Sequence, residues 1–361
     1  MTVSRVVELR TLRASVPLRR TFATAQRSTD RLDVLLVRAI DSDGRVGWGE
    51  VAMSWRVTGE GPAGATAVIE GPLRDAVVGM QLDERGAWGS VIARAVARNP
   101  AARAAVDAAL WDLHAQQLGA PLHRVLATGS AERVRTDMTL AVDDAARVVE
   151  TARIHVDDGF RTLKVKLGTD PEHDDRVVRA LRRGPAAQVA LRVDANQGWS
   201  ADAAIRLVRG WEDDGLGIEL VEQPTPADDL EALARVRAAV ATPILADESV
   251  WDARELRELV RIGAADLVNV KLAKAGGVTA ALALLELAAA SGVGVLLGCM
   301  LESTVGVTAA AHVAAGLPGR VHDLDAAHWL CDSPVRGGAL ARADELELAA
   351  APGLGIDGWA A

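Results

Sequence analysis

The sequence predicts an α/β protein in which a (β/α)-type barrel of eight strands follows a smaller α+β domain. From about residue 130 onward, eight short β-rich runs alternate with longer helical patterns, which is typical of a barrel of parallel strands. The first 50 residues instead alternate hydrophobic and polar positions, as antiparallel strands do. At 361 residues the chain also exceeds the usual size of a single core, which favours two folding units.

The first 125 residues are expected to form the smaller domain. Three strand-like segments, with a turn at Asp43-Gly44 before the last one, predict an antiparallel meander. A long helix should follow, with Asn99 as its N-cap and Pro100 at its first position. The strand-like segments are 3–14, 32–41 and 46–50.

The barrel is expected over residues 126–326. Its active site should lie at the carboxyl ends of the strands, where the loops of such barrels carry the functional side chains. Residues 327–361 contain turns and no further strand–helix unit, so we expect this tail to return to the first domain. The eight β-rich runs are 134–140, 160–167, 189–196, 218–224, 242–249, 266–271, 292–300 and 321–326.

Composition argues against several classes of protein. A net charge of −9, with no basic stripe interleaved with aromatic residues, argues against nucleic-acid binding. The Ala-rich stretch 280–298 is interrupted by Glu286 and by glycines, so we expect no membrane span. Cys299 and Cys331 are too few for a disulfide framework, and the N-terminus lacks the pattern of a signal peptide. We expect a cytoplasmic homo-oligomer whose partner is a small-molecule substrate.

Charged side chains stand at the ends of the middle β-rich runs. The three acidic residues of this set are 28 and 25 residues apart, and a lysine follows 24 residues later. Each interval is close to the length of one strand–helix unit, so these side chains take equivalent places around the rim. The set comprises Lys164 and Lys166 on the second run, Asp194 on the third, Glu222 on the fourth, Asp247 on the fifth and Lys271 on the sixth.

Three carboxylates on adjacent strands predict a site for a hard divalent cation. One aspartate at a strand end is usually a helix N-cap or a solvated charge, but Asp194, Glu222 and Asp247 stand in consecutive units. Oxygen-only ligands favour Mg²⁺, with Mn²⁺ second. Asn196 and Glu248 follow two of these ligands, and they either orient the carboxylates or are ordinary polar loop residues.

The lysines predict acid–base chemistry at a carbon atom. Lys164 and Lys166 share the face of a strand that points into the barrel. There, burial and a neighbouring cation are expected to lower a lysine pKa from ~10.4 toward the roughly 7–8 that a base needs. Strands two and six lie opposite each other in an eight-stranded barrel, so Lys166 and Lys271 should face each other across the mouth. Lys274 begins the next helix and is expected to be solvated.

A substrate carboxylate bound to the metal would hold its α-carbon between these two amines. Removal of the α-proton gives an enediolate, whose second negative charge the metal stabilises. Bases on both faces of one carbon suit racemisation or epimerisation. The alternative is that both lysines are surface residues whose stems cover apolar neighbours.

The strand-end motifs resemble those of a known family. TLKVKLG, RVDANQGW, LVEQP, ILADES and LVNVKLAKAGG are similar to successive motifs of the enolase superfamily, muconate-lactonizing enzyme subgroup. The resemblance covers essentially the whole chain, and it implies a (β/α)₇β modified TIM barrel with an N-terminal α+β capping domain. It also implies a role for each strand-end residue: Asp194, Glu222 and Asp247 on Mg²⁺, Lys166 and Lys271 as the acid–base pair, and Lys164 on the substrate carboxylate.

Within this subgroup, the last run resembles the Asp-x-Asp motif of dipeptide epimerases. Asp323 and Asp325 share a face of strand eight, and together they suit the α-ammonium group of a dipeptide whose carboxylate is on the metal. Carboxylates that cap loop amides are the alternative. Thr139, which ends the first run, either matches a position beside the substrate in these epimerases or caps the barrel end. Met300, which ends the seventh run, is expected to contact the substrate.

Two segments of the first domain resemble the loops that close over the substrate in this subgroup. The first lies near residues 17–30 and the second near residues 52–60. Phe22 and Val57 are expected to line the pocket. Arg27 either forms a bidentate pair with an acidic substrate side chain or is a solvated loop charge.

The favoured function is therefore an Mg²⁺-dependent dipeptide epimerase that inverts the α-carbon of the C-terminal residue, with L-Ala-D/L-Glu as the favoured substrate. An o-succinylbenzoate synthase with N-acylamino acid racemase activity, or a muconate-type cycloisomerase, would use the same lysines without an ammonium site. A metal-dependent hydrolase or phosphoryl-transfer barrel is a different class, but the sequence has no metal-binding histidine pair or glycine-rich phosphate loop. A catalytically silent barrel that acts as a binding protein is the remaining alternative.

Overall fold

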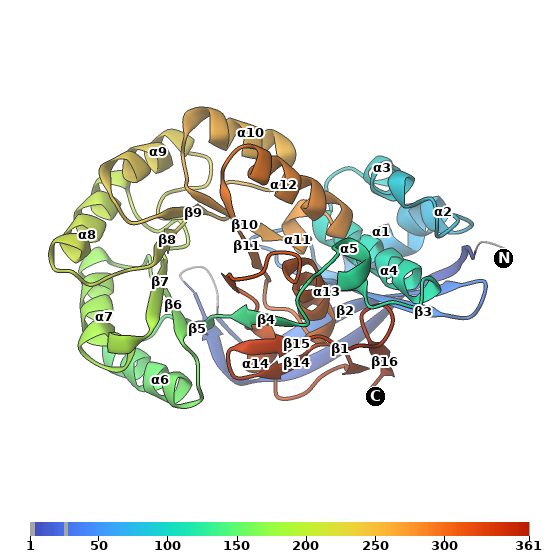
Figure 1. Cartoon of the computed structure of the whole chain (residues 1–361), viewed down its shortest axis with the longest axis horizontal. Helices are drawn as coiled ribbons and strands as arrows, with labels where there is room; N and C mark the ends of the chain where they lie inside the picture. The colour runs from blue at the N-terminus through green and yellow to red at the C-terminus, as the bar shows by residue number, and fades with distance from the viewer. Residues whose placement is uncertain (1–3, 25–27, 361) are drawn as a thin grey trace.

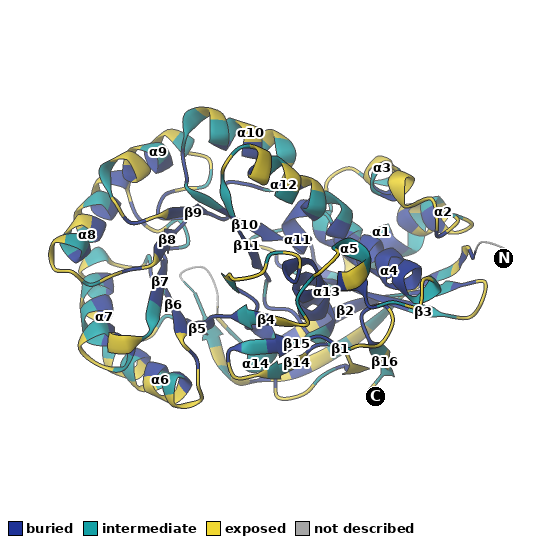
Figure 2. Ribbon diagram, viewed as in Figure 1, coloured by how far each residue is buried: buried dark blue, intermediate teal, exposed yellow. Residues whose placement is uncertain are grey.

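The structure of the chain, a computed structural model, describes residues 4–24 and 28–360. A broad arc of helices surrounds the parallel strands, and the N-terminal sheet with its helices packs at one side of them (Figure 1). The strands are largely buried, whereas the outer faces of the helices are exposed (Figure 2). No helix within the described residues is long and apolar enough to span a bilayer.

The first domain contains the predicted antiparallel meander. Its strands are β1 (Val6–Ala23), β2 (Ser28–Asp41) and β3 (Val46–Val51), in sheet order β1-β2-β3. The long helix α4 (Pro100–Gln117) packs so closely on β3 that a Cβ atom on Gly49 would lie 1.9 Å from the main-chain oxygen of Ala105. Only glycine fits this contact. The other helices are α1 (Pro62–Val68), the π-helix η1 (Ile69–Leu73), α2 (Arg74–Val77), α3 (Arg85–Ala95) and α5 (Leu122–Leu126).

The start of α4 differs from the prediction in its capping group. Asn99 holds the N-cap position and Pro100 the first turn, but the Asn99 side chain makes no capping hydrogen bond. The buried Glu60 carboxylate instead accepts from the N–H groups of Ala101 and Ala102, at 2.8 and 2.9 Å. A carboxylate suits the positive end of the helix dipole. Because Glu60 lies 41 residues before Ala101, the local pattern did not reveal it.

The predicted β-rich runs form a closed barrel of parallel strands. The strands β5 to β11 are neighbours in sequence order, and β12 pairs in parallel with β4. A bridge between Gly298 and Asp323 joins the end of β11 to the chain just after β12 and completes the ring. The strands are β4 (Arg133–Thr136), β5 (Met138–Leu140), β6 (Thr162–Lys166), β7 (Ala190–Asp194), β8 (Leu220–Glu222), β9 (Ile244–Ala246), β10 (Leu267–Lys271), β11 (Gly294–Gly298) and β12 (Val321–His322).

The helices confirm the (β/α)₇β arrangement. Helices follow the first seven runs, but the eighth is followed only by the four-residue helix α14 (Ala326–Trp329). The barrel helices are α6 (Ala145–Asp157), α7 (Pro171–Arg183), α8 (Ala201–Asp213), α9 (Leu230–Ala239), α10 (Ala253–Ile262), α11 (Leu272–Ala275) with α12 (Val278–Ala290), and α13 (Thr304–Ala314). A 3₁₀ turn, η2 (Pro185–Gln188), precedes β7.

The C-terminal segment touches both parts of the molecule. Its hairpin of β14 (Leu340–Arg342) and β15 (Glu345–Glu347) extends the barrel edge, because β15 pairs with β4. The remaining strands, β13 (Val335–Gly337) and β16 (Ile356–Trp359), pair with each other. Leu330 forms a bridge to Leu18 of β1, and the Cys331 N–H donates to the Pro17 oxygen at 3.0 Å. This contact brings the end of β1 against α14 and the residues that directly follow it.

A buried carboxylate of the first domain joins it to the barrel. Glu50 on β3 accepts hydrogen bonds from the N–H and hydroxyl groups of Ser303 and from the N–H of Gly306, at 2.6–3.0 Å. These groups form the first turn of α13, so the carboxylate caps a barrel helix. Glu302 is buried beside it and accepts from the Met300 N–H. Burial, followed by the charge of Glu50, raises the pKa of Glu302 to about 8.

This raised pKa predicts a specific dependence of stability on pH. Because Glu302 titrates near 8 in the folded chain and near its ordinary value when unfolded, the folded state holds an extra proton between about pH 4.5 and 8. Stability is therefore lost as the pH rises through this window. A glutamine at this position keeps the acceptor for Met300 and cannot ionise, so the Glu302→Gln variant should gain on the order of 3 kcal/mol relative to wild type between pH 5 and 8. Urea unfolding at pH 5, 6.5 and 8 measures this difference. Parallel pH profiles for the two proteins would contradict it.

Candidate active site

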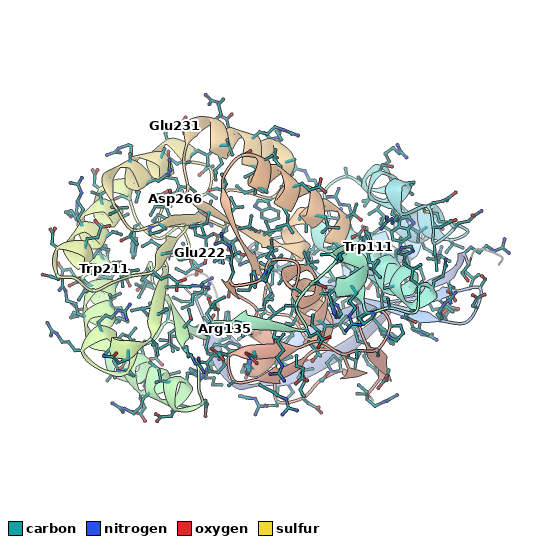
Figure 3. The ribbon with its side chains drawn as sticks, in the orientation of Figure 1. Trp111, Arg135, Trp211, Glu222, Glu231 and Asp266 are labelled. Carbon is teal, nitrogen blue, oxygen red and sulfur yellow. The ribbon has the colours of Figure 1, made fainter. Side chains whose placement is uncertain are left out.

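The charged strand ends meet at a pocket in the mouth of the barrel, closed on one side by the first domain. Asp194, Glu222 and Lys164 lie beneath its lining and are almost fully buried. Glu222 lies inside the ring of strands, whereas Trp211 belongs to the outer layer of helices (Figure 3). Arg27 lies outside the described residues. The predicted residues that line the pocket are Phe22, Val57, Thr139, Lys166, Asn196, Asp247, Glu248, Lys271, Met300, Asp323 and Asp325.

The three predicted metal ligands come from neighbouring strands at one level. Asp194 pairs with Glu222 in the register of β7 and β8, and Asp247 directly follows β9. Their mutual repulsion is visible in Glu222, because burial and then the charge of Asp194 raise its pKa to about 8.

Each lysine of the predicted acid–base pair contacts one of these ligands. The Lys166 ammonium donates to Asp194 Oδ2 at 2.6 Å, and the Lys271 ammonium donates to Asp247 Oδ2 at 2.8 Å. Lys166 ends β6 and Lys271 ends β10, so the three ligand-bearing strands stand between them. Both lysines line the same pocket from opposite ends of the carboxylate row.

The pKa of Lys271 is raised, whereas the sequence predicted a lowered value. Burial is the largest influence and would lower the pKa of Lys271, but the carboxylates of Asp247, Asp323 and Glu222 together raise it above its ordinary value. The same pairing lowers the pKa of Asp247 against the effect of burial. In this arrangement the pair is therefore an ammonium and a carboxylate, and the predicted base role of Lys271 would require the charge of Asp247 to be engaged elsewhere.

Lys164 occupies the centre of the buried charges. Its ammonium lies 2.7 Å from Glu222 Oε2, 2.8 Å from Asp323 Oδ2 and 3.1 Å from Asp194 Oδ2. Burial lowers the pKa of Lys164, but these carboxylates together raise it well above its ordinary value. Because Lys164 is fully buried, its contacts in this structure are with the carboxylates and not with the pocket space.

The donor set fits a hard divalent cation by its chemistry. Among residues 4–24 and 28–360, no three acidic, cysteine or histidine side chains stand in the geometry of a formed metal centre. The ammonium groups of the lysines instead form ion pairs with the carboxylate oxygens of the site. Asp194, Glu222 and Asp247 offer only oxygen ligands from three adjacent strands, which is the donor set that Mg²⁺ prefers.

The two residues that follow the ligands are in contact with each other. The Asn196 N–H donates to Asp194 Oδ1 at 2.9 Å, and its Nδ2 donates to Glu248 Oε1 at 3.3 Å. Asn196 has a φ of 43°, a left-handed conformation that asparagine tolerates better than most residues. This turn directs its main-chain N–H at the carboxylate, as an orienting role requires.

The strand-eight aspartates differ in their partners. Asp323 Oδ2 is held by Lys164 and, at 3.3 Å, by Asn269. Asp325 Oδ2 accepts from the Thr139 N–H at 2.8 Å and from Trp329 Nε1 at 3.0 Å. Asp325 forms no ion pair with a described lysine or arginine, so it is the more available of the two carboxylates for a cationic ligand.

Comparison with known families matches both parts of the chain. Residues 6–127 match the family model for the mandelate racemase / muconate lactonizing enzyme N-terminal domain. Residues 147–358 match the family model described as enolase C-terminal domain-like. The chain belongs to the mandelate racemase/muconate lactonizing enzyme family. This membership confirms the resemblance seen in the strand-end motifs.

Relatives within the family span nearly the whole chain. The L-Ala-D/L-Glu epimerase of Bacillus subtilis is 37% identical over 358 residues, which cover 99% of this chain and 98% of the relative. A hydrophobic dipeptide epimerase of Enterococcus faecalis is 39% identical over 349 residues, covering 96% and 98%. The structure of the substrate-liganded Bacillus subtilis epimerase superposes with a TM-score of 0.96 at 37% identity, over 99% of this chain and 100% of that one. The Enterococcus faecalis enzyme with Mg and L-Leu-L-Tyr gives a TM-score of 0.93 at 37% identity, over 98% and 99%.

Lys274 is the clearest error of the sequence analysis. It was expected to be solvated, but it is 3% exposed. Its ammonium donates to the main-chain oxygen and to Oδ1 of Asp247, and also to the oxygens of Val250 and Asn269. The four-residue helix α11 follows β10 without a loop, and its last turn therefore points Lys274 back at the predicted metal ligand.

Amino-acid usage offered a signal for this residue. Among the 40 Lys and Arg residues only four are lysines, and all four lie in or directly beneath the pocket. All the remaining residues among these 40 are arginines. A guanidinium cannot be deprotonated in proteins, whereas an ammonium can, so the rarity of lysine singles out the site. Asn269 was missed as well, although it lies two residues before Lys271 and so shares the interior face of β10.

Removal of the Lys274 ammonium should destabilise the fold. A Lys274→Met variant leaves Lys271 as the one ion-pair partner of Asp247 among the described residues and removes the buried ammonium donor of three main-chain oxygens, which costs about 2–4 kcal/mol. Guanidinium unfolding measures this loss. The control is Arg237→Met, which breaks a half-exposed ion pair with Asp266 and should cost below about 1 kcal/mol. A Lys274→Met variant as stable as this control would contradict the assignment.

Proposed function

We propose that this chain is an Mg²⁺-dependent dipeptide epimerase, which transfers a proton from one face of the C-terminal residue's α-carbon to the other. The observation that carries the proposal is the placement of Lys166 and Lys271 at the two ends of one row of carboxylates in a shared pocket. A carbon atom held over the middle of that row would have an amine on each face. This arrangement suits inversion better than a one-sided elimination.

The residues divide the reaction between them. Asp194, Glu222 and Asp247 would hold Mg²⁺, which supplies a fixed positive charge that stabilises the negative charge developing on the substrate carboxylate. One lysine, as the neutral amine, accepts the α-proton at its Nζ atom and leaves the α-carbon planar. The other lysine, as the ammonium, returns a proton to the opposite face. The roles exchange when the other epimer is the substrate, so the reaction runs in both directions.

The carboxylate pair on strand eight would select for a dipeptide. Asp325 and Asp323 line the pocket near Thr139, and an α-ammonium group is the cationic end of a dipeptide. An N-acylated amino acid carries no such cation and would leave Asp325 without a cationic partner from the substrate. The relatives named L-Ala-D/L-Glu epimerase and hydrophobic dipeptide epimerase support this choice over N-acylamino acid racemisation or cycloisomerisation.

The C-terminal side chain of the substrate is proposed to be acidic, as in L-Ala-D/L-Glu. Arg56 lines the pocket from the first domain and forms no ion pair with a described residue. Val57, Phe22 and Met300 supply apolar walls. A guanidinium at this edge would bind a second substrate carboxylate bidentately, either together with Arg27 or in its place. A cytoplasmic location and a homo-oligomeric state are further parts of the proposal.

Proton exchange in D₂O tests the proposed reaction. With Mg²⁺, the purified protein should exchange the C-terminal α-proton of L-Ala-L-Glu and form L-Ala-D-Glu, as followed by ¹H NMR. L-Ala-L-Lys should be at least about tenfold poorer, because its cation faces Arg56. N-acetyl-L-Glu should exchange far more slowly, and prior treatment with EDTA should abolish exchange until Mg²⁺ is restored. Exchange of N-acylamino acids without exchange of any dipeptide would refute the proposal.

A further inference from the structure

The indole of Trp329 lies between the strand-eight carboxylate and the first domain. Trp329 ends α14, four residues after Asp325, and its side chain is fully buried. Its Nε1 donates to Asp325 Oδ2 at 3.0 Å, and the same oxygen accepts from the Thr139 N–H at 2.8 Å. A carboxylate turns easily about its last side-chain torsion, which has a broad profile. Two fixed donors on one oxygen, from β5 and from α14, hold that torsion.

The other oxygen of Asp325 is left for the pocket. Oδ1 accepts no hydrogen bond from a described residue, and Asp325 is part of the pocket lining. Trp329 itself lines the pocket beside Ala326. The orientation that the indole imposes on Asp325 therefore decides where Oδ1 points.

Two side chains at the end of β1 hold the indole ring. The Arg20 guanidinium carbon lies 4.5 Å from the ring centroid, and Phe22 meets the ring edge-on with centroids 4.9 Å apart. Such cation–π and edge-to-face contacts fix a ring in position. Arg20 is partly buried, also contacts the His155 ring, and has its pKa lowered by burial. The Leu18–Leu330 bridge extends the same contact along the chain.

We propose that Trp329 is a positioning residue for recognition of the substrate α-ammonium group: it orients Asp325 through its Nε1–H while the end of β1 holds its ring. This inference rests on the proposed dipeptide function. Under this inference, selectivity for a substrate with a free N-terminus depends on the two aspartates and also on the packing of the first domain against α14. Charge-assisted hydrogen bonds are about twice as strong as neutral ones, so loss of this N–H has a measurable effect.

The test removes the N–H and keeps an aromatic ring at this position. Trp329→Phe should raise the KM for L-Ala-L-Glu about tenfold and leave kcat within about twofold of wild type. The Ki of N-acetyl-L-Ala-L-Glu as a competitive inhibitor should stay within about twofold, because that ligand has no ammonium group for Asp325. 3-Benzothienylalanine at position 329 has the shape of tryptophan without the N–H, and it should reproduce the result even if the Phe variant folds poorly.

A second buried tryptophan provides a matched control. Trp211 is 1% exposed, its Nε1 donates to the Asp175 carboxylate at 2.9 Å, and neither residue belongs to the pocket lining. Trp211→Phe loses an equivalent hydrogen bond and should leave KM, kcat and Ki unchanged.

Three outcomes separate the possibilities. Equal rises in the KM of the dipeptide and the Ki of its N-acetyl form would show that Trp329 is only a wall of the pocket, and would overturn the inference. Unchanged KM in both Trp329 variants would overturn it as well. If wild-type protein epimerises no dipeptide at all, the proposed function fails first, and the inference fails with it.

Discussion

Buried charge balance at the mouth of the barrel is the constraint on which the site depends. Four lysine ammonium groups and the carboxylates of Asp194, Glu222, Asp247 and Asp323 share one desolvated space. A single buried charge without a partner costs several kcal/mol, so no member of this set is tolerable alone. The parallel register that brings β6 to β10 to one level is what makes the set possible, because it delivers the opposite charges side by side.

The first domain completes this site by contacts that lie outside the barrel ring. Glu50 caps α13 directly after the pocket-lining end of β11, and the end of β1 packs on Trp329 next to Asp325. The first contact reaches the helix that follows the pocket residues Met300 and Leu301, and the second reaches a helix that itself lines the pocket. Under the proposed role of Trp329, this one side chain would serve both the docking of the first domain and the orientation of Asp325.

Sequence patterns predicted the features that repeat or are local. The barrel and its six strand-end charges repeat once per strand–helix unit, and the meander alternates with period two, so both could be found without knowledge of long-range contacts. Lys274, the capping of α4 by Glu60 and the partnership of Trp329 with β1 depend on approaches between distant segments, which no local period records. The lowered pKa failed as an expectation for Lys271 because the carboxylates of Asp247, Asp323 and Glu222 together outweigh burial. The cytoplasmic location and the homo-oligomeric state of the protein remain predictions.

Stereospecific exchange by single-lysine variants tests the two-base account most directly. Lys166→Met and Lys271→Met would each be incubated with the L,L and the L,D dipeptide in D₂O, and loss of the α-proton would be followed by NMR. If one lysine serves each face, each variant still exchanges the α-proton of one epimer, without inversion, and no longer exchanges the α-proton of the other. The two variants then retain exchange with opposite epimers. Loss of the same epimer in both variants, or inversion at the wild-type rate in either, would contradict the account.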